Sequence, residues 1–206
     1  MKIKLCGLTR SQDILAANAC LPDYIGFVFA KSRRQITPHR AYELRTLLSS
    51  RIQAVGVFVD ADHEEIISLY QNGIIDFVQL HGSEDERYIT KLKDACPCPI
   101  IKAVRVQSKK DILKAQDLPC DFLLLDTYVQ GSLGGSGRAF DHSIIPPLTK
   151  PFFLAGGINA HNIVQAMRAN PYAIDVSSGI ETDGSKDEQK MIELTRLVKG
   201  YQPVMK

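Results

Sequence analysis

Short apolar stretches alternate along the chain with longer amphipathic ones. Eight of the short stretches are rich in β-branched and aromatic residues, as strands buried on both faces usually are. Successive stretches end about 20 to 30 residues apart, which leaves room for one loop and one helix between consecutive strands. The predicted strands are Ile3–Cys6, Tyr24–Phe29, Ala54–Val59, Phe77–Leu80, Ile100–Val104, Phe122–Asp126, Phe152–Ala155 and Ala173–Val176.

Several of the intervening segments carry helix start and stop signals. Thr37 stands where an N-cap is expected, and Pro38 fills the first helical position. Asn72 and Gly73 form a typical C-terminal stop. The segments with the clearest signals predict helices over Pro38–Ser49, Asp62–Gln71, Ser83–Ala95 and Lys186–Val198.

Eight repeats of strand and helix indicate an α/β fold. Two architectures suit such a pattern, a closed TIM (β/α)8 barrel and an open doubly wound sheet. The count of eight and the regular spacing favour the barrel. No linker or low-complexity stretch interrupts the 206 residues, so we expect one barrel domain over residues 1–206.

Composition excludes several classes of function. Hydrophobic residues make up 45% of the chain and charged residues 23%, which suits a globular protein with a buried core. The net charge of +2 is too weak to predict nucleic-acid or membrane binding. No apolar run approaches the ~20 residues that span a bilayer, and the N-terminus does not resemble a signal peptide. We therefore expect a cytoplasmic protein, as a monomer or homodimer, with a small molecule as its partner.

The cysteines and histidines do not predict a metal site. Five cysteines are an odd number and are scattered, which does not suit a disulfide framework. Only Cys96 and Cys98 lie close together, and we interpret them as loop residues. The five histidines are dispersed as well. We expect no metal and no cofactor.

Two reactive side chains stand at predicted strand ends, where the active sites of barrel enzymes are found. Cys6 ends the first strand and Asp126 the sixth, so a thiol and a carboxyl would reach one mouth. Alternatively, Cys6 is a small buried apolar residue and Asp126 caps a loop. If both face the mouth, they form a pair of catalytic acid and base.

Below Cys6, strand alternation places Lys4 inside the barrel. A buried ammonium needs a partner, and Asp175 on the neighbouring eighth strand is the candidate. A cation at this place would also lower the pKa of the Cys6 thiol. Alternatively, the two residues form a structural pair without effect on Cys6.

Glycine and serine dominate the late loops. Gly156 and Gly157 follow the seventh strand, and Ser177, Ser178 and Gly179 follow the eighth. Barrel enzymes often bind phosphate with these two loops through backbone N–H groups. We therefore expect a phosphorylated ligand. A third glycine-rich loop, with Gly135 near its centre, follows Asp126 and is long enough to cover that ligand.

Two further loops carry candidate substrate contacts. Arg34 follows the second strand and could pair with a carboxylate through two hydrogen bonds. For Arg33 or Arg34 the alternative is a solvated basic turn. His81 follows the fourth strand and either contacts the substrate or only bonds a loop.

Taken together, these residues resemble the phosphoribosylanthranilate isomerase family, the enzymes of the third step of tryptophan biosynthesis. The resemblance runs nearly from end to end. It departs from the family pattern at His142, where many members have tryptophan. The motifs that carry it are Lys4-Leu5-Cys6-Gly7-Leu8-Thr9, Ser32 to Pro38, Gln79-Leu80-His81-Gly82, Leu125-Asp126, Gly134-Gly135-Ser136-Gly137, Ala155-Gly156-Gly157-Ile158, Asp175 to Glu181 and Gly184-Ser185-Lys186-Asp187.

The resemblance implies an Amadori rearrangement of an aminoaldose phosphate to an aminoketose phosphate. It assigns the general base to Cys6, the general acid to Asp126 and the contact with the substrate carboxylate to Arg34. It places the phosphate on the late glycine and serine loops. Such a reaction needs no redox cofactor, since one carbon is oxidised as its neighbour is reduced.

Two rival functions remain at this point. A Schiff-base aldolase on the same fold would use Lys102, which lies near the end of the fifth strand. A non-catalytic sensor of phosphoribosyl ligands would keep the binding loops without turnover. A covalent adduct on Lys102 after borohydride trapping with substrate would favour the first, and tight ligand binding without product would favour the second. The presence of both Cys6 and Asp126 argues against the sensor.

Overall fold

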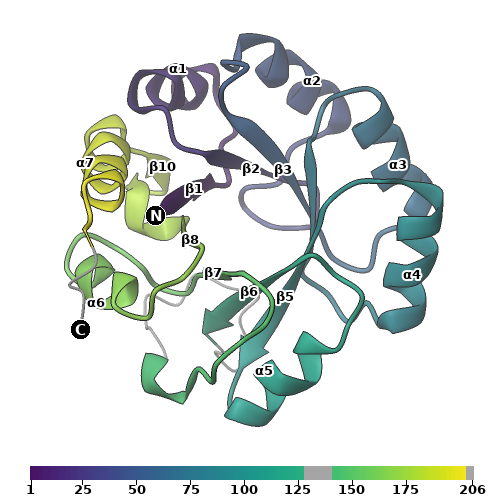
Figure 1. Cartoon of the computed structure of the whole chain (residues 1–206). Coiled ribbons are helices and arrows are strands. Elements are labelled where there is room, and N and C mark those ends of the chain that lie inside the picture. The colour runs from purple at the N-terminus through teal and green to yellow at the C-terminus, as the bar shows by residue number, and fades with distance from the viewer. Residues whose placement is uncertain (128–140, 203–206) are drawn as a thin grey trace.

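The computed structural model describes residues 1–127 and 141–202. Eight parallel strands pair in chain order, and the eighth pairs with the first, so that the sheet closes into a barrel. Figure 1 shows the helices in a ring around these strands. The strands are β1 (Lys2–Cys6), β2 (Tyr24–Val28), β3 (Gln53–Phe58), β4 (Phe77–Leu80), β5 (Ile100–Val106), β6 (Phe122–Thr127), β7 (Phe152–Leu154) and β8 (Ala173–Val176).

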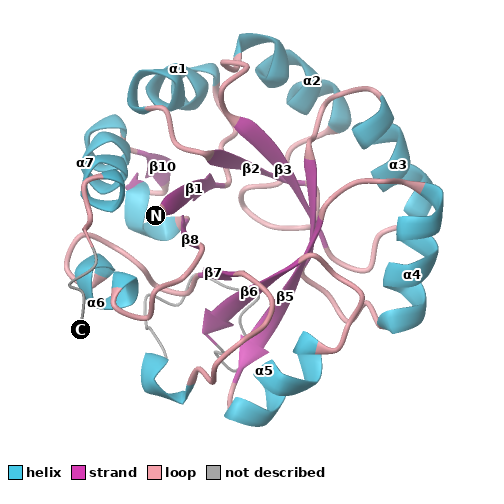
Figure 2. Ribbon diagram, viewed as in Figure 1, coloured by secondary structure: helices cyan, strands magenta, loops and turns pink. Residues whose placement is uncertain are grey.

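The helices connect consecutive strands and pack against the outside of the barrel, as the colouring of Figure 2 makes plain. After β8 comes a small hairpin of two antiparallel strands, β9 (Glu181–Thr182) and β10 (Ser185–Lys186). The α-helices are α1 (Ser11–Cys20), α2 (Pro38–Leu47), α3 (His63–Gln71), α4 (Glu86–Ala95), α5 (Lys109–Gln116), α6 (Ile163–Met167) and α7 (Glu188–Lys199), with 3-10 helices η1 (His142–Ile144) and η2 (Ser178–Ile180).

The predicted barrel is confirmed, and its predicted strands differ from the observed ones by at most two residues at either end. Thr37 caps α2 as predicted, because its side chain accepts a hydrogen bond from the Arg40 amide. Three helix starts were predicted too early, that of α3 by one residue because Asp62 is its N-cap. The N-cap of α4 is Asp85, which accepts from the Tyr88 amide, and that of α7 is Asp187.

The interior of the barrel is filled in layers. At the N-terminal ends of the strands, aromatic rings pack edge to face, with Tyr24 5.3 Å from Phe77 and 5.4 Å from Phe153 between ring centroids. These rings fill that end of the barrel. Towards the C-terminal ends of the strands, the side chains that point into the barrel are polar instead of apolar. The candidate site therefore lies at this end of the barrel.

Candidate active site at the mouth of the barrel

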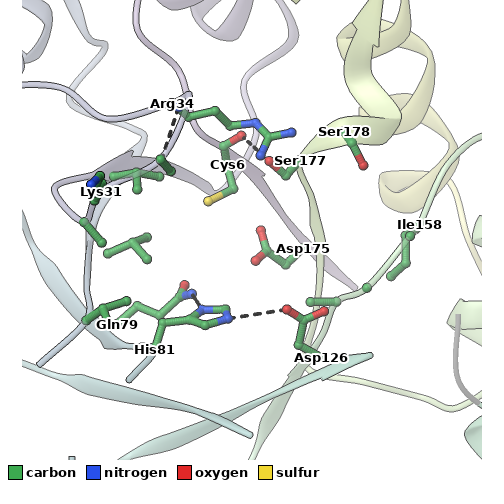
Figure 3. A pocket seen from close by; sticks show the side chains of 18 residues that line it. Cys6, Lys31, Arg34, Gln79, His81, Asp126, Ile158, Asp175, Ser177 and Ser178 are labelled. Carbon is green, nitrogen blue, oxygen red and sulfur yellow. Dashed lines mark hydrogen bonds and ion pairs between the residues drawn. The ribbon is translucent and has the colours of Figure 1, made fainter. Parts of the chain in front are cut away.

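A cavity opens at the C-terminal ends of the strands, and Figure 3 shows the side chains that line it. It encloses about 900 Å³ when the part open to solvent is counted. Cys6 and Asp126 both line it and point into it. The structure therefore brings together the thiol and the carboxyl that the sequence predicts as a pair.

The Cys6 thiol occupies space that a glycine on the neighbouring strand leaves free. Cys6 pairs with Gly26 of β2 across the parallel ladder. A Cβ atom on Gly26 would lie 2.6 Å from Cys6 Sγ, closer than van der Waals contact allows. Glycine at this position is what leaves room for the sulfur atom. The side chain is largely buried, with Cys6 8% exposed at the floor of the cavity.

Beneath the thiol lies the predicted ion pair. Lys4 is fully buried, and its Nζ donates to Asp175 Oδ1 at 3.1 Å and to Oδ2 at 3.0 Å. Burial works against the charge of Lys4, but the nearby Asp175 and Cys6 outweigh it and raise the lysine pKa. Lys4 therefore carries a stable positive charge within the barrel.

The thiol pKa does not follow the prediction from sequence. Burial, assisted by the Asp175 carboxylate, raises the pKa of Cys6, and the ammonium groups of Lys4 and Lys186 only partly offset this. The cation is thus where it was predicted, but loss of solvation outweighs its attraction for a thiolate. In the free protein Cys6 is a thiol at neutral pH.

Asp126 at the end of β6 contacts His81, which follows β4. Its Oδ1 accepts a hydrogen bond from the Thr127 amide at 2.8 Å. Its Oδ2 lies 3.4 Å from His81 Nε2. His81 lines the cavity as predicted, and its contact with Asp126 adds a role that the sequence did not suggest.

Arg34 reaches over the cavity from the loop between β2 and α2. Its Nε donates to Glu181 Oε1 at 2.6 Å and its Nη2 to Oε2 at 3.1 Å, which fixes the guanidinium plane. The Arg34 side chain is 17% exposed and lines the cavity, whereas that of Arg33 is 57% exposed and contacts Glu181 from outside. Of the two arginines, Arg34 is thus the one that lines the cavity, and it is the arginine that the resemblance indicates.

Glu181 and Lys186 are site residues whose roles were not predicted. Lys186 Nζ donates to Glu181 Oε1 at 2.8 Å and to the Ser177 carbonyl at 2.9 Å. The pKa of Glu181 falls to about 2, since Arg34 and Lys186 outweigh the opposing effect of its burial. Both residues stand in motifs that carry the resemblance, but the sequence did not reveal their contacts, because Glu181 acts on Arg34, in a loop far away in the chain.

The two late loops predicted to bind phosphate form one wall of the cavity. Gly156, Gly157, Ser177 and Ser178 all line it. Gly156 has φ 92°, a conformation that favours glycine, and a side chain there would collide with Thr127. Gly179 packs closely on the backbone of the β7–α6 loop. The predicted contact at Gly135 lies outside the described residues.

Lys102 does not enter the cavity. On β5 the side chains of Ile101 and Ala103 point into the barrel, so that Lys102 between them points outward. Its Nζ donates to Glu84 Oε2 at 2.7 Å and to the Gly82 carbonyl at 2.8 Å. A lysine engaged in this way outside the barrel cannot form a Schiff base in the mouth, which removes the structural basis of the aldolase alternative.

Metal ligands do not cluster in the described part of the chain: residues 1–127 and 141–202 contain no group of three or more His, Cys, Asp or Glu side chains placed to hold an ion. The thiol, carboxyl and ammonium groups of the mouth are of the kinds that move protons on a sugar phosphate.

Comparison with known proteins gives a consistent result. The family model described as N-(5'phosphoribosyl)anthranilate (PRA) isomerase matches residues 3–196. A relative from Endomicrobium trichonymphae with the name N-(5'-phosphoribosyl)anthranilate isomerase is 46% identical, over 97% of this chain and 98% of its own length.

Solved structures agree with this match. The crystal structure of phosphoribosyl anthranilate isomerase from Thermotoga maritima covers 98% of this chain and 100% of its own, with a TM-score of 0.88 and 33% identity. A phosphoribosyl anthranilate isomerase in complex with reduced 1-(o-carboxyphenylamino)-1-deoxyribulose 5-phosphate covers the same shares, with a TM-score of 0.81 and 30% identity.

Proposed function

The chain belongs to the N-(5'-phosphoribosyl)anthranilate isomerase family, and from this premise we propose that Cys6 is the general base and Asp126 the general acid of its reaction. That reaction is the Amadori rearrangement of N-(5-phosphoribosyl)anthranilate to 1-(2-carboxyphenylamino)-1-deoxyribulose 5-phosphate, in tryptophan biosynthesis. The observation that carries the two roles is that both side chains line one cavity at the barrel mouth.

The first step opens the sugar ring. A protonated Asp126 gives its proton to the furanose oxygen as the bond from that oxygen to C1 breaks. The electron pair of the anthranilate nitrogen forms the C1–N double bond, which leaves an iminium cation. Asp126 ends this step as a carboxylate, and its Oδ1 then accepts the hydrogen bond from the Thr127 amide.

The second step moves the proton from C2. The Cys6 thiol first releases its own proton to solvent. The iminium acidifies the C2 proton, the resulting thiolate removes it to give the enolamine, and the enolamine takes up a proton at C1 as it tautomerises to the ketone. The positive charge of the iminium adds to those of Lys4 and Lys186 and favours the thiolate. The substrate thereby supplies the part of the electrostatic stabilisation that the buried thiol lacks in the free enzyme.

Binding is assigned to the rest of the mouth. The loops that contain Gly156, Gly157, Ser177 and Ser178 would hold the phosphate through backbone N–H groups. The Nη1 of Arg34 is not used by Glu181 and would meet the anthranilate carboxylate. The five cysteines are free thiols, which supports a reducing compartment such as the cytoplasm.

The test is turnover of freshly made phosphoribosylanthranilate, followed by its fluorescence. We expect Asp126→Asn to lower kcat by about 10²–10⁴, the usual contribution of a general acid. Binding of the reduced product analogue to this variant should stay within a few-fold of wild type. Asp117→Asn, on the exposed C-cap of α5, is the matched control. If both Asp126→Asn and Cys6→Ser turned over at near-wild-type rates, the assignment would be wrong.

A further inference from the structure

Gln79 is a buried amide in the barrel interior that the mechanism above does not use. It lies on β4, is 1% exposed and lines the cavity next to His81. Figure 3 shows its amide group beside the imidazole ring, with His81 between Gln79 and Asp126. The three side chains form a row that leads from the barrel interior to the proposed general acid.

The contacts in this row fix the protons on the imidazole. Gln79 Nε2 lies 2.9 Å from His81 Nδ1. With the amide nitrogen turned towards the ring, Gln79 donates, and Nδ1 then accepts and carries no proton. The ring proton of neutral His81 then belongs on Nε2, which lies 3.4 Å from Asp126 Oδ2.

We propose that Gln79 is a positioning residue for the acid step: its amide holds His81 as the neutral tautomer whose Nε2–H group faces Asp126. This inference rests on the proposed function. When Asp126 gives its proton to the ring oxygen, the Nε2–H group stabilises the carboxylate that forms. A proton on Nδ1 would break the contact with Gln79, because the ring nitrogen and the Gln79 amide nitrogen would then both be donors.

Other charged groups near His81 have different partners. Asp60 from the loop after β3 accepts from the Ser83 amide and hydroxyl, and Glu84 is paired with Lys102. Arg105 at the end of β5 shares a groove with His81 and is exposed. Among the described residues, only Gln79 and Asp126 lie within bonding distance of the imidazole nitrogens.

The carbonyl oxygen of the Gln79 amide is available for a contact with the substrate. Its Oε1 is buried and accepts no hydrogen bond within the described part of the protein. A buried carbonyl oxygen usually has a donor, and the open-chain sugar offers hydroxyl groups in this cavity. The same amide would thus contact the substrate through its oxygen and orient His81 through its nitrogen.

The direct test is the tautomer of His81, read from the ¹⁵N chemical shifts of histidine-labelled protein. His81→Asn identifies which of the five histidine signals belongs to His81. We expect an unprotonated Nδ1 and a protonated Nε2 in the wild type near neutral pH. A protonated Nδ1 would overturn the proposal, and this readout needs no turnover.

Two variants test the link to catalysis. Gln79→Glu replaces the donor by an acceptor, so we expect the proton to move to Nδ1 or the ring to become doubly protonated. We expect kcat to fall at least tenfold, with a shifted pH profile. Gln79→Met keeps the length of the side chain and removes both hydrogen bonds, and should lower kcat without imposing the Nδ1–H form. Gln71→Glu, exposed at the end of α3, is the matched control.

The outcomes separate this inference from the function on which it rests. An unchanged His81 tautomer or unchanged kcat in folded Gln79→Glu protein would refute the role of Gln79, even if Asp126→Asn abolishes turnover. Full activity of Asp126→Asn would refute the acid assignment, whatever the tautomer.

Discussion

At the scale of single residues, the site is governed by the competition between solvation and charge. Lys4 and Cys6 lie on the same face of β1 and are both buried. Lys4 has a carboxylate within hydrogen-bond distance and keeps its charge, whereas the nearby ammonium groups of Lys4 and Lys186 do not offset the burial of Cys6, which keeps its proton. The proposed base would therefore become reactive when the substrate brings a further positive charge.

This competition predicts how Cys6 reacts with iodoacetamide in the free enzyme. Only the thiolate reacts, and the pKa of Cys6 is raised above its ordinary value of 9.0. The thiolate fraction should therefore rise about tenfold for each pH unit between pH 7 and 9. We expect the alkylation rate to follow this slope without a plateau. Mass spectrometry identifies the modified cysteine, with Cys6→Ser as the background.

A rate that is already constant at neutral pH would show instead that Lys4 and Lys186 maintain a preformed thiolate. That result would restore the expectation drawn from the sequence.

At the scale of elements, Glu181 joins the loop between β2 and α2 to the hairpin after β8. It accepts hydrogen bonds from Arg33, Arg34 and Lys186, and its side chain is 6% exposed. Lys190 of α7 also donates to the Glu181 carbonyl at 2.8 Å. One carboxylate thus orients the arginine that is proposed to bind the substrate.

Glu181→Gln should raise KM about tenfold, the result of losing near 1.4 kcal/mol of binding, with a smaller change in kcat. Arg34 would keep its length but lose the plane that Glu181 imposes. Steady-state kinetics measures the effect, and Arg34→Ala gives the KM that results when the guanidinium is removed altogether. Asp183→Asn, on the exposed turn of the same hairpin, should leave KM unchanged.

The Glu181 carboxylate should also account for part of the stability that the fold loses in acid. Its pKa falls from an ordinary 4.5 to about 2 in the folded protein. A lowered folded-state pKa stabilises the fold above pH 4.5, and this stabilisation is lost as the pH falls towards 2. Urea unfolding between pH 6 and 3 should therefore show a shallower loss of stability for Glu181→Gln than for the wild type. Equal slopes would contradict the assigned pKa.

At the scale of the whole molecule, closure of the barrel brings the two ends of the sequence together. β1 pairs with β8 in parallel, and Lys4 lies opposite Asp175 in this register. The bond between these side chains therefore crosses the seam where the sheet closes.

In the described part of the chain, no helix is long and apolar enough to cross a bilayer.

Lys4→Met should cost about 3–5 kcal/mol of unfolding free energy, because it leaves Asp175 charged, buried and unpaired. The double variant Lys4→Met/Asp175→Leu removes both charges and should recover a large part of this loss. Urea denaturation followed by circular dichroism measures both. If the double variant were as unstable as the single one, the cost would come from packing around Lys4 rather than from the stranded carboxylate.

Local sequence determined the elements and much of the candidate site. Strand alternation put Lys4 on the same face of its strand as Cys6, and the strand ends singled out Cys6, Asp126 and the loops that form the mouth. This works because β-strand geometry and loop position follow from short stretches of sequence. The proximity of Lys4 and Asp175 was predictable as well, since eight strands in chain order must bring the last one beside the first.

Only the tertiary structure decided the properties that depend on several distant residues at once. The pKa of Cys6 results from burial by the whole barrel, the orientation of Arg34 from a carboxylate about 150 positions later in the chain, and the contact of His81 with Asp126 from two separate strands that meet at the mouth. The physical reason is that side-chain identity sets which interactions are possible, while solvation and hydrogen-bond direction exist only once the chain has folded.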